Sequence, residues 1–388
     1  MPSNSSFGQF LRSPRKRAIT AYGLLLACIS IFFISFLYYE YHQALDEGWD
    51  KVWNRADLAG EWVTSVFELS TMALEGLEEL SHSPLTALSS DTVDIEYEQV
   101  ERLLAERGAR FPFLDELGLF DSDGRVVATS SPVFPRGYDL GGLPHFKIFR
   151  EQPELEEWVS GLYWTALGER YFVMHARRLN EDIGLNAGIA VIRLTPDVFG
   201  EALARLSMSS DESLSLVDMN ADLVARRPLY EKATTGDSVM SPDVLDKIKN
   251  NGDQLALRAT SPIDGIERLF AIKKVGDLPM IVVAGTSVES LLSGWQRRVW
   301  ISLGLWLLLA SLGGALLRHY LIRLALYRAA RIAAAAFETQ QGLIVTDDNT
   351  RVLHVNEAFT RITGYSEKDV AGRQPRFLFA GERDTRLY

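Results

Sequence analysis

A strand-like stretch near the middle of the chain carries side chains that suit a small polar ligand. The alternation expected of a strand over residues 171–179 places Tyr171, His175 and Arg177 on one face. An aromatic ring, an imidazole and a guanidinium can bind such a ligand together, and the guanidinium can hold a carboxylate through two hydrogen bonds. The opposite face is apolar and suits packing against a helix; it consists of Phe172, Met174 and Ala176. The predicted pocket contains eight residues: His145, Phe149, Trp158, Tyr163, Trp164, Tyr171, His175 and Arg177.

The same residues also fit a purely structural role. Arg177 can pair with a nearby acid, and the aromatic side chains can belong to an ordinary core. Both interpretations stay open at the level of the sequence.

The sequence contains no motif typical of a catalytic centre. It has no phosphate-binding glycine loop, no nucleophilic-serine motif and no zinc-binding HExxH motif. The six histidines are scattered without metal-ligand spacing, and Cys28 is the single cysteine. The acidic run Glu154–Glu157 fits a solvated helix start better than an acid/base pair. We therefore predict no catalytic site, no metal site and no cofactor.

Charge is distributed unevenly along the 388 residues. Residues 42–296 hold 23 Lys and Arg against 42 Asp and Glu, a net charge of −19, whereas the whole chain carries −11. The remaining residues therefore carry +8. An acidic block of this size repels phosphate backbones, which argues against a nucleic-acid partner.

Two uncharged apolar runs are long enough to cross a lipid bilayer. Residues 18–39 contain no charged side chain, and at about 1.5 Å per residue a helix of this length spans a hydrocarbon core of roughly 30 Å. Basic residues at positions 12–17 precede the run and acidic residues at 40–50 follow it, so the N-terminus is expected in the cytoplasm. A cleaved signal peptide would need small residues at its end, but Tyr38, Tyr39 and Tyr41 stand there. We predict a retained anchor.

The second run, residues 299–317, is followed by Arg318, Arg323 and Arg328, which place its C-terminal end inside. Both termini are then cytoplasmic and the acidic block is exported, as expected for a protein of a bacterial inner membrane. The predicted segments are a cytoplasmic tail (1–17), a first span (18–41), an exported block (42–296), a second span (299–322), a linker helix (323–336) and a C-terminal fold (337–388).

The exported block is predicted to be α+β, with two similar modules built on one long helix. Each module begins with a strand, a turn and a strand, and the two turns lie at Asp121–Gly124 and Asp218–Ala221. A short helix is expected near residues 144–151, and Thr195-Pro196-Asp197 opens another. Three further strands complete each module: 158–164, 170–179 and 188–194 in the first, and 254–260, 268–275 and 280–286 in the second.

The long helix carries apolar side chains at spacings of three and four from Trp49 to Leu80, five heptads in all. This stripe can pack along its own domain, or it can form a seam between two chains. Both interpretations hold if one face of the helix packs on the domain and the opposite face contacts a partner chain.

With these elements in place, the exported block resembles the double Cache (tandem PAS-like) sensor domains of bacterial receptors. The resemblance rests on Asp121–Ala128, Ala176–Asn180, Ser215–Asp218, Ala225–Pro228, Asp264-Gly265, Ile272–Val275 and Leu278-Pro279. It implies a small-molecule ligand, which we place in the membrane-distal first module. Amino-acid-binding members carry an Arg beside an aromatic pair in the distal helix, and Leu143–Phe146 lacks that Arg.

The C-terminal fold resembles the start of a cytoplasmic PAS domain in Val355–Phe359, Ile362–Tyr365, Gly372 and Pro375–Leu378. Asn356 is expected to cap one helix, and Ser366–Asp369 forms a capping box at the next. About half of such a domain precedes Tyr388, so we expect a fragment of a longer protein. Residues that bind haem or flavin would lie beyond this point.

The resemblance implies a transmembrane receptor that regulates a cytoplasmic output. The combination of double Cache and PAS domains is similar to the front end of proteins with GGDEF or EAL domains, which make or break cyclic-di-GMP. The sensor portion of a histidine kinase, or a chemoreceptor, is the alternative. We also predict a homodimer that transmits the signal through the helix from residue 318 to 340, with Leu317, Leu321, Leu324 and Arg331 near one seam.

Overall fold

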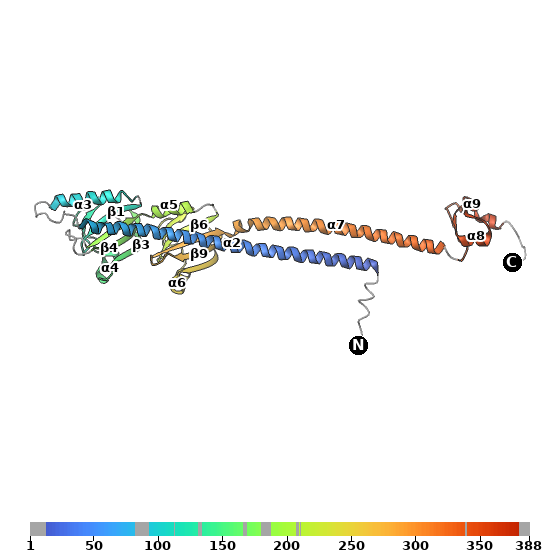
Figure 1. Cartoon of the computed structure of the whole chain (residues 1–388), viewed down its shortest axis with the longest axis horizontal. Helices are drawn as coiled ribbons and strands as arrows, with labels where there is room; N and C mark the ends of the chain where they lie inside the picture. Colours follow the sequence, from blue (N-terminus) through green and yellow to red (C-terminus); the bar gives the residue numbers. More distant parts are fainter. Residues whose placement is uncertain are drawn as a thin grey trace, which may run out of the picture. The chain divides into compact units, whose positions relative to one another are not determined.

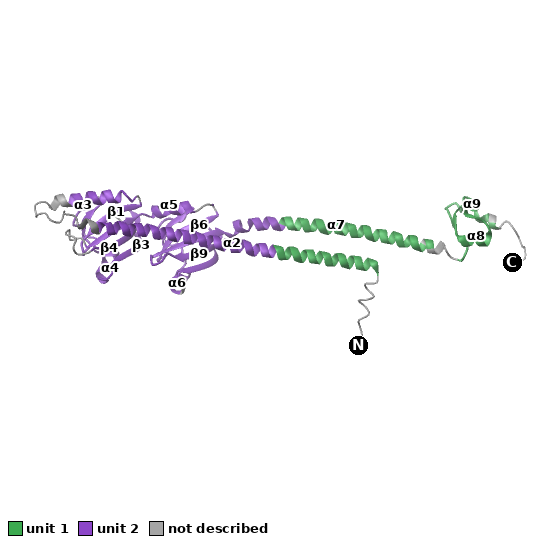
Figure 2. Ribbon diagram, viewed as in Figure 1, with its two compact units in different colours: residues 1–36, 300–388 green, residues 37–299 purple. Residues whose placement is uncertain are grey.

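The computed structural model describes residues 13–81, 93–111, 113–130, 134–165, 169–179, 188–206, 209, 211–337 and 340–379. The predicted tail before residue 13 and the C-terminal residues after 379 lie outside this range. The chain divides into two compact units (Figure 2). Unit 1 contains residues 1–36 and 300–388, and unit 2 contains residues 37–299.

Unit 2 contains two five-stranded antiparallel sheets with the same strand order (Figure 1). The first sheet has the order β2-β1-β5-β4-β3 and the second has the order β7-β6-β10-β9-β8. The predicted pair of α+β modules is therefore confirmed. The strands of the first module are β1 (Leu114–Phe120), β2 (Val126–Thr129), β3 (Glu157–Thr165), β4 (Arg170–Arg178) and β5 (Ile189–Leu194). Those of the second module are β6 (Glu212–Asp218), β7 (Leu223–Arg227), β8 (Gln254–Thr260), β9 (Glu267–Lys274) and β10 (Met280–Ser287).

The first hairpin of each module turns on an aspartate at an equivalent position. The Asp121 carboxylate accepts hydrogen bonds from the backbone N–H groups of residues 123 and 125, at 3.0 and 2.8 Å. Asp218 accepts the equivalent bonds from residues 220 and 222, at 2.8 and 2.9 Å. Gly124 (φ 89°) and Ala221 (φ 74°) take the left-handed conformation three residues after each aspartate. The turn chemistry in the sequence thus predicted both hairpins.

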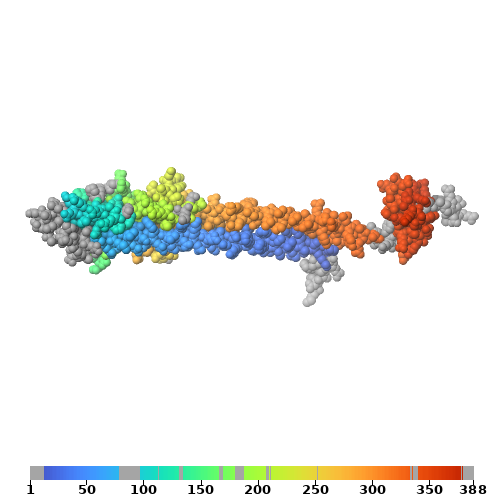
Figure 3. Space-filling model, turned by 45° about the horizontal axis from the view of Figure 1, so that its top comes forward, coloured from blue at the N-terminus to red at the C-terminus, as the bar shows by residue number. Residues whose placement is uncertain are grey.

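Helix α2 (Pro14–Ser81) begins in unit 1 and continues along both sheets of unit 2. Its inner stripe joins one continuous core with the sheets and includes Val52, Ala56, Ala59, Val63, Val66, Leu74 and Leu77. The stripe therefore packs along its own domain, which accounts for the predicted heptads within one chain. The opposite side of α2 is open to the surface (Figure 3) and exposes Leu58, Leu69 and Met72.

Shorter helices complete the two modules. In the first module, α4 covers the sheet face opposite α2, and Phe146 and Phe149 of α4 pack against β-strand side chains there. In the second module, Val244, Leu245 and Ile248 of α6 pack in the same way. The helices are α3 (Val93–Gly108), α4 (Pro144–Glu151), α5 (Pro196–Leu206) and α6 (Pro242–Asn251). The structure confirms the predicted short helix at residues 144–151.

Within unit 1, the N-terminal part of α2 lies beside α7 (Val288–Phe337). The Tyr22 hydroxyl donates to the carbonyl of Ala310, and the indole of Trp306 donates to Ser30 Oγ at 3.0 Å. Both helices are long and apolar enough to cross a membrane, and their most apolar windows are not buried inside the chain. This pair matches the two apolar runs found in the sequence.

The C-terminal part of unit 1 contains a hairpin and short helices around a small core. Val352, Val355, Phe359 and Val370 form this core. Asn356 Oδ1 accepts from the Phe359 N–H at 2.9 Å, and the capping box of Ser366 and Asp369 is present, as predicted. The elements are β11 (Ile344–Thr346), β12 (Val352–Val355), α8 (Glu357–Thr363), α9 (Glu367–Val370) and η2 (Pro375–Phe379).

Candidate ligand-binding site

A cavity of about 60 Å³ lies in the first module, on the sheet face that α4 covers. Its walls come from four strands, from the segment that leads into α4 and from the first turn of α4. Most of the lining is apolar: Phe120, Phe134, Leu140, Leu143, Phe172, Met174 and Val191. Such a shape suits a compact ligand with an apolar body, whose orientation is fixed by a few polar groups.

Those polar groups come from a bulge at the start of β1. The pairing of β1 with β5 shifts register between Leu114 and Glu116, so Asp115 and Glu116 both lie opposite Arg193. The Arg193 Nη2 atom lies 2.7 Å from Asp115 Oδ2 and 2.7 Å from Glu116 Oε2. The Arg193 guanidinium also lies over the Phe172 ring, 4.2 Å from its centroid. One cation is thus held by two carboxylates at the cavity wall.

Asp115 and Glu116 together place two carboxylates on one guanidinium, and of the two acids Glu116 lines the cavity. Glu116 is buried, with 6% of its surface exposed. The pKa of its carboxyl group is raised, mainly by burial. The positive charge of Arg193 lowers this pKa, and the negative charge of Asp115 raises it. A ligand ammonium group placed beside Glu116 would compensate this charge.

His145 also lines the cavity, from the first turn of α4. It is 2% exposed, its ring stacks on Trp158 at 6.5 Å, and its Nδ1 atom is buried without a hydrogen-bond partner among the described residues. Burial lowers the pKa of this imidazole to about 3. His145 is therefore neutral at physiological pH.

We predict that His145 makes unit 2 sensitive to mild acid. Its pKa is about 3 in the folded state and 6.5 in the reference state, so between these values the unfolded chain binds the extra proton. Stability is thus fully present above pH 6.5 and falls as the pH drops toward 3. Between pH 6.5 and 5, this group should cost about 2 kcal/mol of unfolding free energy. Urea unfolding at pH 7 and at pH 5 measures the loss. Between these two pH values, the unfolding free energy of the wild type should fall by about 2 kcal/mol more than that of His145→Leu. Equal losses in both proteins would contradict the assignment.

Four of the eight predicted pocket residues lie on the side of the cavity. His145 and Tyr163 line the cavity itself, and Phe149 and Trp158 belong to the apolar cluster around it. The prediction that Tyr171, His175 and Arg177 share the cavity face is wrong, because the cavity face of β4 carries Phe172 and Met174 instead. Trp164 pairs with Tyr171 across the strands and is 49% exposed.

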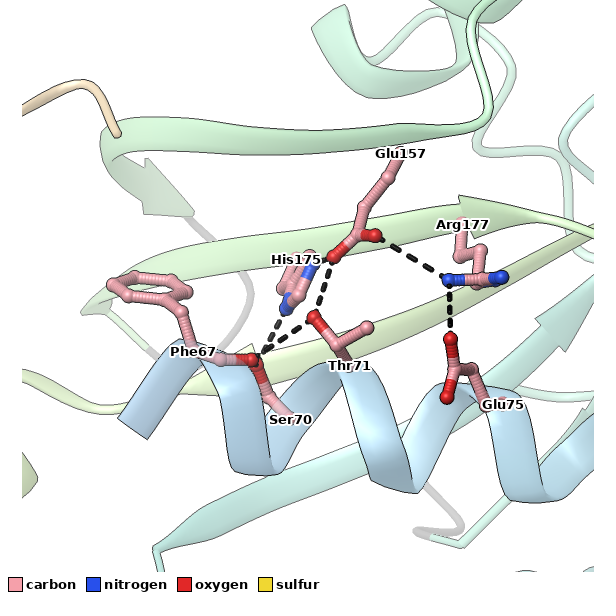
Figure 4. Close-up of polar contacts among 7 residues, drawn as sticks. All are labelled: Phe67, Ser70, Thr71, Glu75, Glu157, His175 and Arg177. Carbon is pink, nitrogen blue, oxygen red and sulfur yellow. Dashed lines mark hydrogen bonds and ion pairs between the residues drawn. The ribbon is translucent and has the colours of Figure 1, made fainter. Parts of the chain in front are cut away.

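The polar face of β4 does not line the cavity because its side chains have partners on α2 (Figure 4). His175 Nδ1 lies 2.5 Å from Ser70 Oγ, and its Nε2 contacts Glu157 Oε1. Thr71 donates to the same Glu157 oxygen at 2.6 Å. A buried imidazole with both nitrogens paired is stable between helix and sheet, so its polarity does not indicate a pocket.

Arg177 belongs to the same helix–sheet contact. Its Nη1 atom lies 3.1 Å from Glu75 Oε1 on α2 and 3.4 Å from Glu157 Oε2 on β3. The hydrogen bond from His175 is the main cause that lowers the pKa of Glu157 to about 2, against the opposing effect of its burial. The structure thus favours the pairing with local acids that the sequence had left open.

Asp115, Glu116 and Arg193 were missed from the sequence. The bulge that brings the two carboxylates to one guanidinium is a pairing shift with no signature in the local residues. A signal did exist: Arg193 is the one basic residue in an otherwise apolar predicted strand at 188–194, and a charged residue in such a run needs a partner.

Within the described residues, no group of three or more His, Cys, Asp or Glu side chains could hold a metal ion. The Glu116–Arg193 ion pair is the charged part of the cavity lining.

Comparisons with known proteins agree with this architecture. Among solved structures, the extracellular domain of a protein named as a histidine kinase, rpHK1S-Z16, matches with a TM-score of 0.53 and 19% identity, over 65% of this chain and 99% of that domain. Unit 2 therefore has a fold similar to that of this extracellular domain. A PAS domain model matches residues 340–388. The search of curated proteins finds no match.

Two chemoreceptor domains match less closely. The ligand-binding domain of Campylobacter jejuni Tlp3, solved with L-norvaline, has 15% identity and a TM-score of 0.46, over 65% of this chain and 93% of that one. The ligand-binding domain of Pseudomonas fluorescens CtaA, solved with L-isoleucine, has 14% identity and a TM-score of 0.47, over 66% of this chain and 98% of that one.

Proposed function

We propose that this protein is a membrane-anchored sensor whose first module binds a small ligand bearing an ammonium group. The proposal rests on an apolar cavity lined by Glu116 and Arg193, in which the Arg193 guanidinium is also paired with Asp115 behind the cavity lining. An incoming ammonium group would balance the charge and donate a hydrogen bond to the carboxylate of Glu116. The aromatic and aliphatic walls would enclose the apolar body of the ligand.

This proposal replaces the carboxylate-bearing ligand expected from Arg177. Arg177 contacts Glu75 and Glu157 on the opposite sheet face, and Arg193, the guanidinium at the cavity, already contacts two carboxylates. Ligand recognition is therefore proposed to centre on Glu116.

The sensor module is proposed to lie outside a bacterial inner membrane, with residues 42–296 in the periplasm. Two apolar helices flank unit 2, and the −19 charge of residues 42–296 contrasts with the basic flanks at 12–17 and 318–331. Both helices enter unit 2 side by side, where Trp295 donates to the Leu37 carbonyl at 2.9 Å and Arg298 contacts Glu40 at 2.8 Å. A change in unit 2 can thus reach both helices.

Of the outputs that the sequence suggested, a histidine kinase has the support of the fold comparison with rpHK1S-Z16. A chemoreceptor would carry long heptads after the second span, whereas a PAS domain match begins at residue 340. A cyclic-di-GMP output rests only on the sequence resemblance.

We predict that two chains pair through α7 below the second span. Single cysteines placed at each position from 317 to 336, in a Cys28→Ser background, should crosslink between chains with a helical period of three to four residues. The strongest crosslinks are expected near Leu317, Leu321 and Leu324. Cys28 must be replaced because it is exposed and would form its own crosslinks. Crosslinking that is uniform or absent at all positions would contradict the dimer.

Calorimetry on the full chain in lipid nanodiscs tests the ligand proposal. The probe is isobutylamine, and the matched control is isobutanol, which replaces the ammonium group with a neutral hydroxyl of similar size. We expect saturable binding of the amine and binding of the alcohol that is at least about tenfold weaker, because the charge-assisted hydrogen bond is lost. Equal affinity for the two probes would contradict the role of Glu116.

A further inference from the structure

The second module contains a larger cavity that the proposed function does not use. Its volume is about 270 Å³, close to the lower limit of typical small-molecule sites. It lies between the sheet and α6, on the face of the second module equivalent to the one that α4 covers in the first. Most of its lining is apolar: Val217, Val244, Leu257, Phe270, Ile272 and Val283.

A buried cluster of charges lies at one wall of this cavity. Arg226 and Arg268 both contact Asp264, through Nη2 to Oδ2 at 2.9 Å and through Nη1 to Oδ1 at 2.6 Å. All three side chains are buried: Arg226 is 5% exposed, Arg268 is 1% exposed and Asp264 is 8% exposed. Two guanidinium groups thus share one carboxylate, and the cluster holds one positive charge more than it holds negative charges.

The hydrogen bonds of this cluster are also incomplete. Arg226 donates to Ser215 Oγ at 3.0 Å, but its Nε atom is buried and has no hydrogen-bond partner among the described residues. The Nε atom of Arg268 is in the same situation. Arg226 lines the cavity itself, together with the hydroxyl-bearing residues Ser215 and Ser261. Burial, together with the neighbouring Arg268, lowers the pKa of Arg226. A charge cluster with one unbalanced positive charge therefore lies at the edge of an apolar cavity, and Arg226 belongs to both.

We propose that this cavity is a second ligand site, which binds a small aliphatic carboxylate. A single negative charge would balance the excess positive charge of the cluster, whereas a dianion such as phosphate would reverse it. A carboxylate accepts hydrogen bonds from the edge of a guanidinium in plane, and the apolar walls suit a short branched tail. The two modules would then recognise opposite charges, with an ammonium group in the first and a carboxylate in the second.

Methionine methyl groups give each cavity its own reporter. Met240 lines the second cavity and Met174 lines the first. The experiment uses the full chain in nanodiscs with ¹³C-methyl methionine, titrated with isovalerate. We expect a saturable shift of the Met240 methyl resonance, with the Met174 resonance unchanged.

Three variants decide the assignment. Arg226→Gln should weaken the isovalerate response by about tenfold or more, because the charge-assisted hydrogen bonds are lost. Arg227→Gln removes the same charge from the neighbouring position, which does not line the cavity, and should leave the response unchanged. Ala259→Leu keeps the charge cluster but fills cavity space, and should also weaken binding by about tenfold or more.

The outcomes separate this site from the first one. If Arg226→Gln disturbs the second module, which the resonance of Met219 in the apolar cluster of that module reports, Ala259→Leu alone decides. A Met240 resonance that does not respond to millimolar isovalerate overturns the proposal, as does a response that Ala259→Leu leaves intact. Isobutylamine binding is measured by the Met174 resonance and isovalerate binding by the Met240 resonance. The proposal for one cavity can therefore be contradicted while the proposal for the other stands.

Discussion

Asp264→Asn should destabilise unit 2 by about 3–5 kcal/mol, because it leaves two buried guanidinium groups without their shared carboxylate. Arg268 and Arg226 are 1% and 5% exposed, so water cannot replace the lost partner without opening the module. Although burial alone would raise the pKa of Asp264, hydrogen bonds from Arg268 and Ser261 lower it on balance, which indicates that the folded state prefers the charged carboxylate.

Urea unfolding of residues 37–299, the compact unit 2, measures this cost. The matched control is Asp277→Asn in the exposed turn before β10, where we expect a change within about 0.5 kcal/mol. A loss below about 1 kcal/mol for Asp264→Asn would mean that the two arginines are compensated by other groups.

Glu116→Gln should weaken isobutylamine binding by about 10- to 100-fold, because a charge-assisted hydrogen bond to a buried carboxylate is replaced by a neutral one. The substitution keeps the size of the side chain, and Asp115 remains 2.7 Å from Arg193, so the cavity wall is preserved. Since burial already disfavours the charged form of Glu116, the stability of the empty protein should change little.

Calorimetry with the full chain compares this variant with Glu98→Gln. Glu98 is exposed on α3 and pairs with Arg102 one turn away, so its replacement should not alter the affinity. Unchanged binding in Glu116→Gln would place the ammonium group elsewhere.

The architecture of unit 2 could be predicted because its signals are local. Asp121 and Asp218 mark their hairpins through backbone hydrogen bonds within four residues, and Asp347 repeats the pattern in the C-terminal hairpin. The apolar stripe of α2 follows a helical period, and the cap at Asn356 needs only the next three residues. Each of these patterns is complete within one element.

The site could not be predicted to the same depth, because its chemistry depends on pairs from different elements. Glu116 meets Arg193 only through a bulge, and Arg226 meets Asp264 across thirty-eight positions of sequence. His175 and Arg177 were assigned to the wrong face because their partners, Ser70 and Glu75, stand on a helix a hundred residues earlier. A polar residue in a strand signals a partner, but the sequence does not tell whether that partner is a ligand or the protein itself.

We propose that the cavity of the first module binds an ammonium-bearing ligand. The most direct test is a titration of the full chain, labelled with ¹³C-methyl methionine, with isobutylamine. We predict a saturable shift of the Met174 resonance that isobutanol does not reproduce at the same concentration, with Met240 unchanged. A Met174 resonance that stays fixed, or a shift confined to Met240, would contradict the claim.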